Sequence, residues 1–385
     1  MLKMAGRAVK ALSPINLPVP LVAKVTTDAV YPNVLRSKSI FIYDGQVAEI
    51  PSGFAAVLYR TENYPLLRDG ANHILISDEY DHLTSGDIVR VTEELALRVM
   101  YRRNGINFML LTERCNSFCI MCSQPPRDID DSHLLKEWLA AIPLMADDGR
   151  QIGITGGEPT LVGDALFEIL ASIRSYLPRS PVHMLTNGRN FKDIELAARF
   201  AAMNLCDVML GIPLYSDVAS VHDYIVQADG AFDETIRGIL NLGRCGVPIE
   251  IRVVLHSENI SRLPELCHFI ARNLQFVHQV ALMALEPIGF AKANMDALWI
   301  DPFDYQGILA EAVDVLRRAH IQTYLFNHQL CTLPRSLWPY ASQSISEWKN
   351  EYLDECRGCE VKSQCGGFFS SAIKKHSIHI APIQL

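Results

Sequence analysis

From residue 106 onward, short apolar runs alternate with amphipathic stretches, and this alternation restricts the chain to few folds. Repeated strand and helix units in this order form a parallel sheet with helices packed outside it. We predict six such units, with strands at Asn107–Thr112, Gln151–Thr155, Val182–Thr186, Asp207–Tyr215, Pro248–His256 and Gln279–Leu285. The expected fold class is α/β, with a partial (β/α)6 TIM-type barrel whose reactive face lies at the carboxyl ends of the strands.

The stretches between these strands have the spacing of helices that bury one face. One apolar stripe repeats at intervals of three and four residues, as expected for a helix packed on a sheet: Leu263, Leu266, Cys267 and Ile270. On the fifth predicted strand, alternate residues from Ile249 to Leu255 are apolar and should face the helices. That leaves Glu250 and Arg252 directed into the barrel.

Three segments are expected along the 385 residues. Residues 1–104 contain short alternating strands with turn signals such as Asp44-Gly45, which predicts a small β-rich domain. The barrel is expected over residues 105–320. Residues 321–385 are rich in Pro, Ser, Gly and Cys, which predicts a loop-rich C-terminal module held by a metal instead of a large core.

Composition narrows the functional class. The net charge of −8 and the absence of a long Lys/Arg run argue against nucleic-acid binding. No apolar run reaches the roughly 18 residues of a membrane span, and the N-terminus lacks signal-peptide features, so a cytoplasmic protein without a membrane partner is expected. Ten cysteines in such a compartment favour metal ligation over disulfides. Three of them, Cys206, Cys245 and Cys267, are predicted to be core thiols.

The motif most informative about chemistry is C-x3-C-x2-C, formed by Cys115, Cys119 and Cys122 directly after the first predicted strand. Three thiolates can hold three irons of a [4Fe-4S] cluster and leave the fourth iron open to bind and reduce a small molecule. The run Gly156-Gly157-Glu158-Pro159 ends the second predicted strand and should lie on the same face. Alone, this run would be weak evidence, since Gly pairs and Pro are common where helices start.

Together, the two runs resemble the radical S-adenosylmethionine (SAM) enzymes. The resemblance implies that SAM chelates the open iron of the cluster held by the three cysteines. It also implies that one electron cleaves SAM to a 5′-deoxyadenosyl radical, which takes a hydrogen atom from a substrate. Gly156, Gly157, Glu158 and Pro159 would then receive the SAM ammonium group. Met121 stands where the family has an aromatic residue near adenine, so the packing of adenine is expected to differ.

Further site residues follow from the resemblance. Arg252 matches a family arginine that pairs with the SAM carboxylate, although an ion pair with Glu250 inside the barrel is an equally good interpretation. Asn187 and Ser216 follow the third and fourth predicted strands and would touch the ribose. A simple turn at Asn187-Gly188 explains the pattern equally well.

A second group of cysteines follows the barrel at Cys331, Cys356, Cys359 and Cys365. Four thiolates can complete either a four-iron cluster or a tetrahedral zinc site, and the spacing alone does not choose between them. The C-x2-C-x5-C-G-G run resembles the SPASM and twitch extensions of peptide-modifying radical SAM enzymes, which carry auxiliary clusters. Because only one set of four ligands is present, the resemblance implies a single auxiliary [4Fe-4S] cluster of twitch type.

The sequence therefore predicts a radical SAM maturase of a ribosomally made peptide. The Met121–Pro126 continuation, the β-rich N-terminus and the C-terminal cysteines resemble the HxsC-type maturases of His-Xaa-Ser peptide systems. That resemblance implies a precursor peptide as substrate, a paired second radical SAM maturase, and flavodoxin or ferredoxin as electron donor. Two alternatives stay open: a twitch-type dehydrogenase or other enzyme acting on a small molecule, and a zinc-bound binding module without catalysis.

Overall fold

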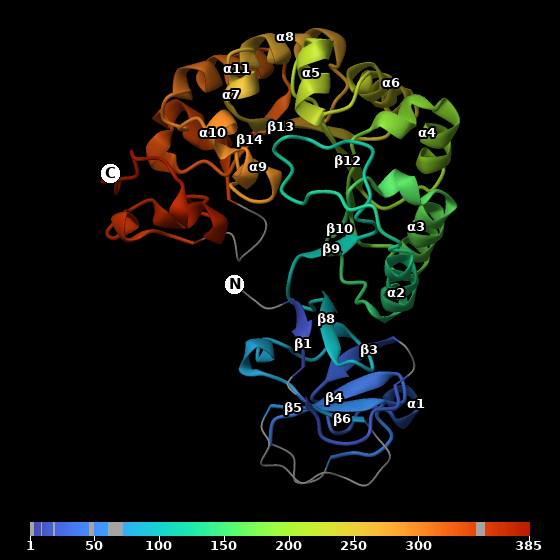
Figure 1. Ribbon diagram of the computed structural model, residues 1–385. Coiled ribbons are helices and arrows are strands. Elements are labelled where there is room, and N and C mark those ends of the chain that lie inside the picture. The colour runs from blue at the N-terminus through green and yellow to red at the C-terminus, as the bar shows by residue number, and fades with distance from the viewer. Residues whose placement is uncertain (1–3, 9, 18–19, 46–49, 61–71, 344–350) are drawn as a thin grey trace. The chain divides into compact units, whose positions relative to one another are not determined.

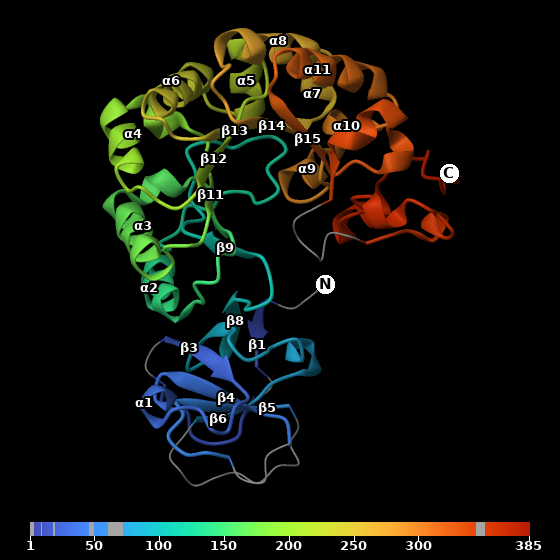
Figure 2. The same ribbon diagram turned by 180° about the vertical axis from the view of Figure 1, so that it is seen from behind.

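The computed structural model describes residues 4–8, 10–17, 20–45, 50–60, 72–343 and 351–385. It contains two compact units (Figures 1 and 2). The first unit consists of Met1–Met109, Asp131–Gly153 and Asp164–Pro181, and the second of Leu110–Asp130, Ile154–Gly163 and Val182–Leu385. Both cysteine groups belong to the second unit.

An eight-stranded sheet forms the N-terminal part of the first unit, in the order β1-β8-β7-β3-β4-β5-β6-β2. Strands β3 to β6 pair in parallel, whereas β7 and β8 run antiparallel to their neighbours. Its strands are β1 (Ala5–Arg7), β2 (Lys10–Ala11), β3 (Leu21–Thr26), β4 (Ser39–Tyr43), β5 (Ala56–Tyr59), β6 (Asn72–Leu75), β7 (Ile88–Val91) and β8 (Ala96–Tyr101). Alternate apolar side chains such as Val25, Ile40 and Leu58 are fully buried in one core cluster. The short helix α1 (Asn33–Arg36) follows β3.

The second sheet has the order β16-β15-β14-β13-β12-β11-β10-β9. Every pair of neighbours from β11 to β16 is parallel. Its strands are β9 (Asn107–Leu110), β10 (Ile152–Thr155), β11 (Val182–Leu185), β12 (Val208–Pro213), β13 (Ile249–Leu255), β14 (Gln279–Ala284), β15 (Gln322–Phe326) and β16 (Ala341–Ser342). Each of the six predicted strands is present, so the predicted α/β fold with a parallel barrel-type sheet is confirmed.

Strands β15 and β16 were not predicted. Gln322–Phe326 pairs in parallel with β14, and its burial alternates between exposed and buried positions. The run is short and follows the last strong apolar stripe, which is why the pattern was too weak to predict a strand. The parallel sheet therefore continues beyond residue 320, where we expected the loop-rich C-terminal module to start.

Helices follow the strands as the βα pattern predicts. They are α2 (His133–Ala141), α3 (Asp164–Tyr176), α4 (Ile194–Ala201), α5 (Ala219–Val226), α6 (Ala231–Arg244), α7 (Ser257–Ile260), α8 (Leu263–Asn273), α9 (Phe290–Ala293), α10 (Met295–Leu298) and α11 (Gln306–Arg318). In the second unit, α4, α5, α6, α8 and α11 form a row outside strands β12 to β14 (Figure 1).

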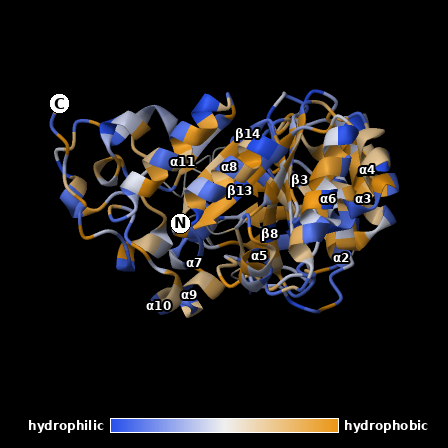
Figure 3. Cartoon of the chain, turned by 90° about the horizontal axis from the view of Figure 1, so that it is seen from above, coloured by the Kyte–Doolittle hydropathy of each residue, from blue (hydrophilic) through white to orange (hydrophobic). Residues whose placement is uncertain are grey.

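Burial of one helix face holds this arrangement together. The predicted stripe of α8 is buried along its whole length, and the strands β13 and β14 that lie beneath it are hydrophobic in Figure 3. Each fully buried Leu or Ile side chain of such a stripe contributes about 1.5–3 kcal/mol.

Of the three predicted core thiols, Cys267 is buried, but Cys206 is exposed, because it lies in the loop after α4. Among the described residues, no helix has the length and hydrophobicity to cross a membrane.

Candidate active site

The loop with Cys115, Cys119 and Cys122 follows β9 and is held by backbone contacts on several sides. Phe118 and Ile120 donate their N–H groups to carbonyl oxygens at the C-terminal end of α5, each at 3.0 Å. On the other side, the N–H of Phe290 donates to the carbonyl oxygen of Cys122 (2.8 Å), and Asn294 Nδ2 donates to that of Ile120 (2.8 Å). These contacts give an irregular loop one defined path.

The two predicted motifs contact each other directly. The N–H of Gly157 donates to the carbonyl oxygen of Thr112, and the N–H of Glu158 to that of Arg114, both at 2.8 Å. A Cβ atom added to Gly157 would lie 2.2 Å from the Arg114 carbonyl oxygen, and one added to Gly156 would lie 2.8 Å from that of Thr112. Glycine is therefore required here because two backbone segments touch.

Glu158 connects three segments of the site. Its side chain is fully buried, and its carboxylate accepts four hydrogen bonds from protein donors: Thr160 N (3.0 Å), Thr160 Oγ1 (2.7 Å), Thr186 Oγ1 (2.8 Å) and Asn187 N (2.6 Å). Burial raises the pKa of Glu158, while these hydrogen bonds lower it. Four donors use the acceptor capacity of a carboxylate, so Glu158 ties the GGEP run to the segment after β11.

Pro159 begins a 3₁₀ helix over Pro159–Val162, with Glu158 as its N-cap. The GGEP run is thus also the helix start that the sequence alone allowed. The same Glu158 carboxylate caps this 3₁₀ helix and accepts the hydrogen bonds from Thr186 and Asn187.

The three cysteine side chains are partly buried and lie near one another. Burial raises the pKa of the Cys115 thiol to about 11 and that of Cys119 to about 12, and the neighbouring thiolates add to each rise. Burial also raises the pKa of Cys122. Buried thiols of this kind ionise when a metal supplies the positive charge, so their chemistry fits an iron cluster. In the described residues, no three His, Cys, Asp or Glu side chains surround a single metal ion; a four-iron cluster takes one thiolate on each iron.

The other predicted site residues make protein contacts of their own. Asn187 donates its side-chain amide to Asn116 Oδ1 within the cysteine loop (2.5 Å), and Ser216 Oγ accepts the N–H of Val218 (3.1 Å). Met121 is buried, with 5% of its surface exposed.

Arg252 lies inside the barrel, as predicted, and forms an ion pair with Glu250 on its own strand. It also contacts the sulfur of Met283 on β14 at 3.1 Å. The ion pair that the sequence left open as an alternative is therefore present.

The four C-terminal cysteines line a single pocket. Tyr352 forms one wall and donates its hydroxyl to the carbonyl oxygens of Lys362 and Cys365, each at 3.0 Å. On another side, the N–H of Ile383 donates to the Cys359 sulfur (3.4 Å). The pocket thus brings all four predicted ligands to one place, although here too no three His, Cys, Asp or Glu side chains of the described residues are arranged to hold a single metal ion.

Comparison with known proteins agrees with this geometry. Residues 109–270 match the sequence profile of the Radical SAM superfamily, and this range contains both the three cysteines and the GGEP run. This part of the chain is therefore similar to the Radical SAM superfamily. The similarity implies SAM and a [4Fe-4S] cluster, and Cys115, Cys119 and Cys122 are the residues that would hold the cluster.

The similar proteins match this chain only in part. Fe-coproporphyrin III synthase of Methanosarcina barkeri is 30% identical over 159 residues, which are 40% of this chain and 38% of that protein. The chain thus spans well under half the length of this relative. SuiB of Streptococcus suis with bound SAM is 15% identical, with a TM-score of 0.46 over 64% of this chain and 54% of its own. The enzyme anSMEcpe with bound SAM is 16% identical, with a TM-score of 0.45 over 57% and 62%.

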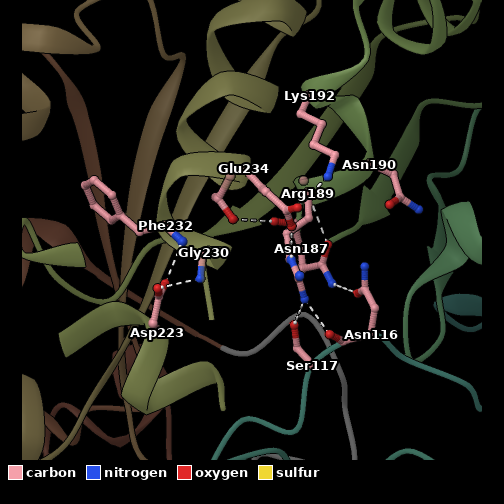
Figure 4. A network of polar contacts seen from close by, with 12 residues as sticks. Asn116, Ser117, Asn187, Arg189, Asn190, Lys192, Asp223, Gly230, Phe232 and Glu234 are labelled. Carbon is pink, nitrogen blue, oxygen red and sulfur yellow. Dashed lines mark hydrogen bonds and ion pairs between the residues drawn. The ribbon is translucent and has the colours of Figure 1, made fainter. Parts of the chain in front are cut away.

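The structure of the second unit adds residues that the sequence did not single out. Tyr215 lies after β12, next to Ser216, and burial, together with repulsion from Cys119 and Cys122, raises its pKa well above the ordinary value. Arg189 bridges Glu234 on α6 and the cysteine loop (Figure 4). The only signal for either in the sequence was its position next to a predicted site residue.

Proposed function

We propose that this protein is a radical SAM enzyme that abstracts a hydrogen atom from a ribosomally synthesised peptide. A reduced [4Fe-4S] cluster with bound SAM supplies one electron that cleaves SAM to methionine and the 5′-deoxyadenosyl radical. The observation that carries the proposal is the direct contact between the cysteine loop and the GGEP run, which puts three thiols beside a defined backbone surface. Gly156 and Gly157 shape that surface, and Glu158 and Asn187 fix it.

We further propose that Cys331, Cys356, Cys359 and Cys365 hold one auxiliary [4Fe-4S] cluster. Their shared pocket supports a common site, and the resemblance of the C-x2-C-x5-C-G-G run to SPASM and twitch segments favours iron over zinc. With no ligand position left open, such a cluster would transfer electrons and would not bind SAM.

Metal analysis after anaerobic purification separates these assignments. We expect about eight irons per chain, falling to about four when either cysteine group is replaced by serine. Cys206→Ser is the matched control, because that thiol is exposed and belongs to neither group. About four irons with one zinc in the unaltered protein would contradict the auxiliary cluster.

The enzymatic proposal is tested by reduction in the presence of SAM. Release of 5′-deoxyadenosine is expected from the unaltered protein and not from the triple serine variant of Cys115, Cys119 and Cys122. A reduced protein with intact clusters that releases none would contradict the enzymatic proposal and favour a binding module.

The peptide substrate rests on the C-terminal cysteine pattern and on the resemblance to maturases of His-Xaa-Ser peptides. Coexpression with short peptides encoded nearby, with and without a neighbouring second radical SAM protein, should change the mass of one peptide. Flavodoxin or ferredoxin is the proposed electron donor. Unchanged masses for every encoded peptide would argue against the maturase.

A small-molecule substrate is the second candidate, and one observation favours it. The matched relative from Methanosarcina barkeri is named Fe-coproporphyrin III synthase, and it is 30% identical to this chain over 159 residues. Added Fe-coproporphyrin III would then bind and shift its own visible absorption, which a peptide maturase is not expected to do.

A further inference from the structure

Arg189 is the first residue of a 3₁₀ helix at Arg189–Lys192, directly after the strand-end segment with Asn187. Its guanidinium group is largely buried, with 12% of the side chain exposed. Nη1 donates to the Asn116 carbonyl oxygen and to Ser117 Oγ (3.1 Å), both between the first two cysteines. Figure 4 shows the side chain extending from its helix toward this loop.

Glu234 holds the other side of the guanidinium group. Arg189 Nε donates to Glu234 Oε2 at 2.7 Å, and Lys192 pairs with the second carboxylate oxygen. Two cations on one carboxylate leave Glu234 fully paired. The charge-assisted hydrogen bond fixes the orientation of Arg189 from the side opposite the cysteine loop.

The first turn of α6, which carries Glu234, is itself firmly placed. Asp223 on α5 accepts the N–H groups of Gly230 (2.8 Å) and Phe232 (2.7 Å) at the start of α6, as Figure 4 shows. A Cβ atom on Gly238 would lie 2.1 Å from the carbonyl oxygen of Gly188, so α6 packs directly on the residue before Arg189. The pairing is therefore built on two rigid elements.

We propose that Arg189, oriented by Glu234, is a positioning residue that fixes the iron-binding loop and supplies a positive charge to the cluster. This inference rests on the proposed binding of a [4Fe-4S] cluster by Cys115, Cys119 and Cys122. The hydrogen bonds at Asn116 and Ser117 hold the loop in its binding shape before iron arrives. The guanidinium group that makes these hydrogen bonds contacts residues between Cys115 and Cys119, so its positive charge lies beside the loop.

Three variants separate the hydrogen bonds from the charge. Arg189→Gln removes the charge and shortens the side chain, whereas Arg189→Lys keeps the charge and loses the planar fork. Lys192→Gln is the matched control, because Lys192 shares Glu234, is 50% exposed and, among the described residues, does not hydrogen-bond to the cysteine loop.

The first measurement is hydrogen exchange of residues 115–122 in the full chain before iron loading. We expect exchange about tenfold faster in Arg189→Gln and Arg189→Lys, because the loop opens more often, and no change in Lys192→Gln. Glu234→Gln, which leaves Arg189 in place, should give a smaller increase. If Arg189→Gln does not fold, Glu234→Gln is compared with Lys192→Gln in its place.

The second measurement is the reduction potential of the loaded protein, followed by electron paramagnetic resonance with dithionite as reductant. The signal that SAM alters belongs to the cluster with the open iron. In Arg189→Gln, loss of the nearby cation should shift the equilibrium about tenfold toward the oxidised cluster. For a one-electron couple, this lowers the reduction potential by about 59 mV. Arg189→Lys should stay near the unaltered value, as should Lys192→Gln.

The proposal is overturned if Arg189→Gln matches Lys192→Gln in both exchange and potential. Failure of the proposed function looks different, since the unaltered protein would then bind no iron at the three cysteines. The exchange comparison would still decide whether Arg189 fixes the loop.

Discussion

Replacement of Gly157 by alanine tests whether the contact between the two motifs builds the site. The added Cβ would lie 2.2 Å from the Arg114 carbonyl oxygen, 2.6 Å from its carbonyl carbon and 3.0 Å from Cys115 Cβ. Because ordinary C···O contacts are about 3.3 Å, the Arg114 carbonyl would have to move by about 1 Å. That carbonyl accepts the Glu158 N–H and directly precedes Cys115, so any shift is passed to the first cysteine.

The expected cost combines two effects. Overpacking costs about 1–3 kcal/mol, and distortion of the Gly157 and Glu158 hydrogen bonds adds about 1 kcal/mol. At roughly 2–4 °C per kcal/mol for a domain of this size, Tm of the protein without iron should fall by on the order of 10 °C. Gly156→Ala should have a smaller effect, since its Cβ would lie 2.8 Å from Thr112 O.

The assay compares thermal unfolding of the protein without iron with iron content after loading. Gly157→Ala should also lose about four irons, because the loop no longer presents Cys115 correctly. Gly307→Ala on α11 is the control, since its Cβ has nothing within 4 Å and should stabilise the helix by up to about 1 kcal/mol. If Gly157→Ala unfolds and loads iron like Gly307→Ala, the contact does not build the site.

Three further predictions test other parts of the structure. Ile383→Pro removes the N–H that donates to the Cys359 sulfur and should lower the potential of the auxiliary cluster, whereas Ile383→Ala keeps it; equal potentials would contradict this role. Burial alone would raise the pKa of Glu250, but His183 and Arg252 lower it from 4.5 to about 2. The Glu250 carboxylate therefore stabilises the folded protein above pH 4.5, and this contribution of about 3 kcal/mol to the free energy of unfolding is lost as the pH falls toward 2. Acid denaturation of Glu250→Gln should not show this loss. Alkylation followed by peptide mass mapping should label Cys206 quickly and Cys267 only on unfolding; equal rates would contradict their burial.

The sequence predicted the strands well where the apolar run was strong. Six strands were found from their runs and from the helical stripes between them, because burial on both faces of a parallel strand leaves a clear pattern. Strand β15 escaped prediction because Gln322 and Tyr324 interrupt its pattern with more exposed positions. Residues 322–326 form a strand because they pair with β14, and their own sequence does not indicate that pairing.

The sequence indicated the motifs of the candidate site but not the residues that support them. Cysteine spacing and the GGEP run predict a role because ligand number and turn geometry constrain short segments. The partner of Arg189 lies 45 residues away on α6, and no local pattern indicates that pairing. The acceptor role of Glu158 toward Asn187, 29 residues away, escaped for the same reason.

The anchoring of the cysteine loop has a consequence for how the protein matures. The Ile120 carbonyl oxygen accepts from Asn294, which lies 174 residues later, and the Cys122 carbonyl oxygen accepts from Phe290. Contacts over such separations form late, because closing a long segment of chain must come first. A nascent chain that ends before Phe290 would lack these two contacts, and its cysteine loop would be held only by the segments that precede β14. The loop should therefore reach its final path only after β14 and α9 have been synthesised.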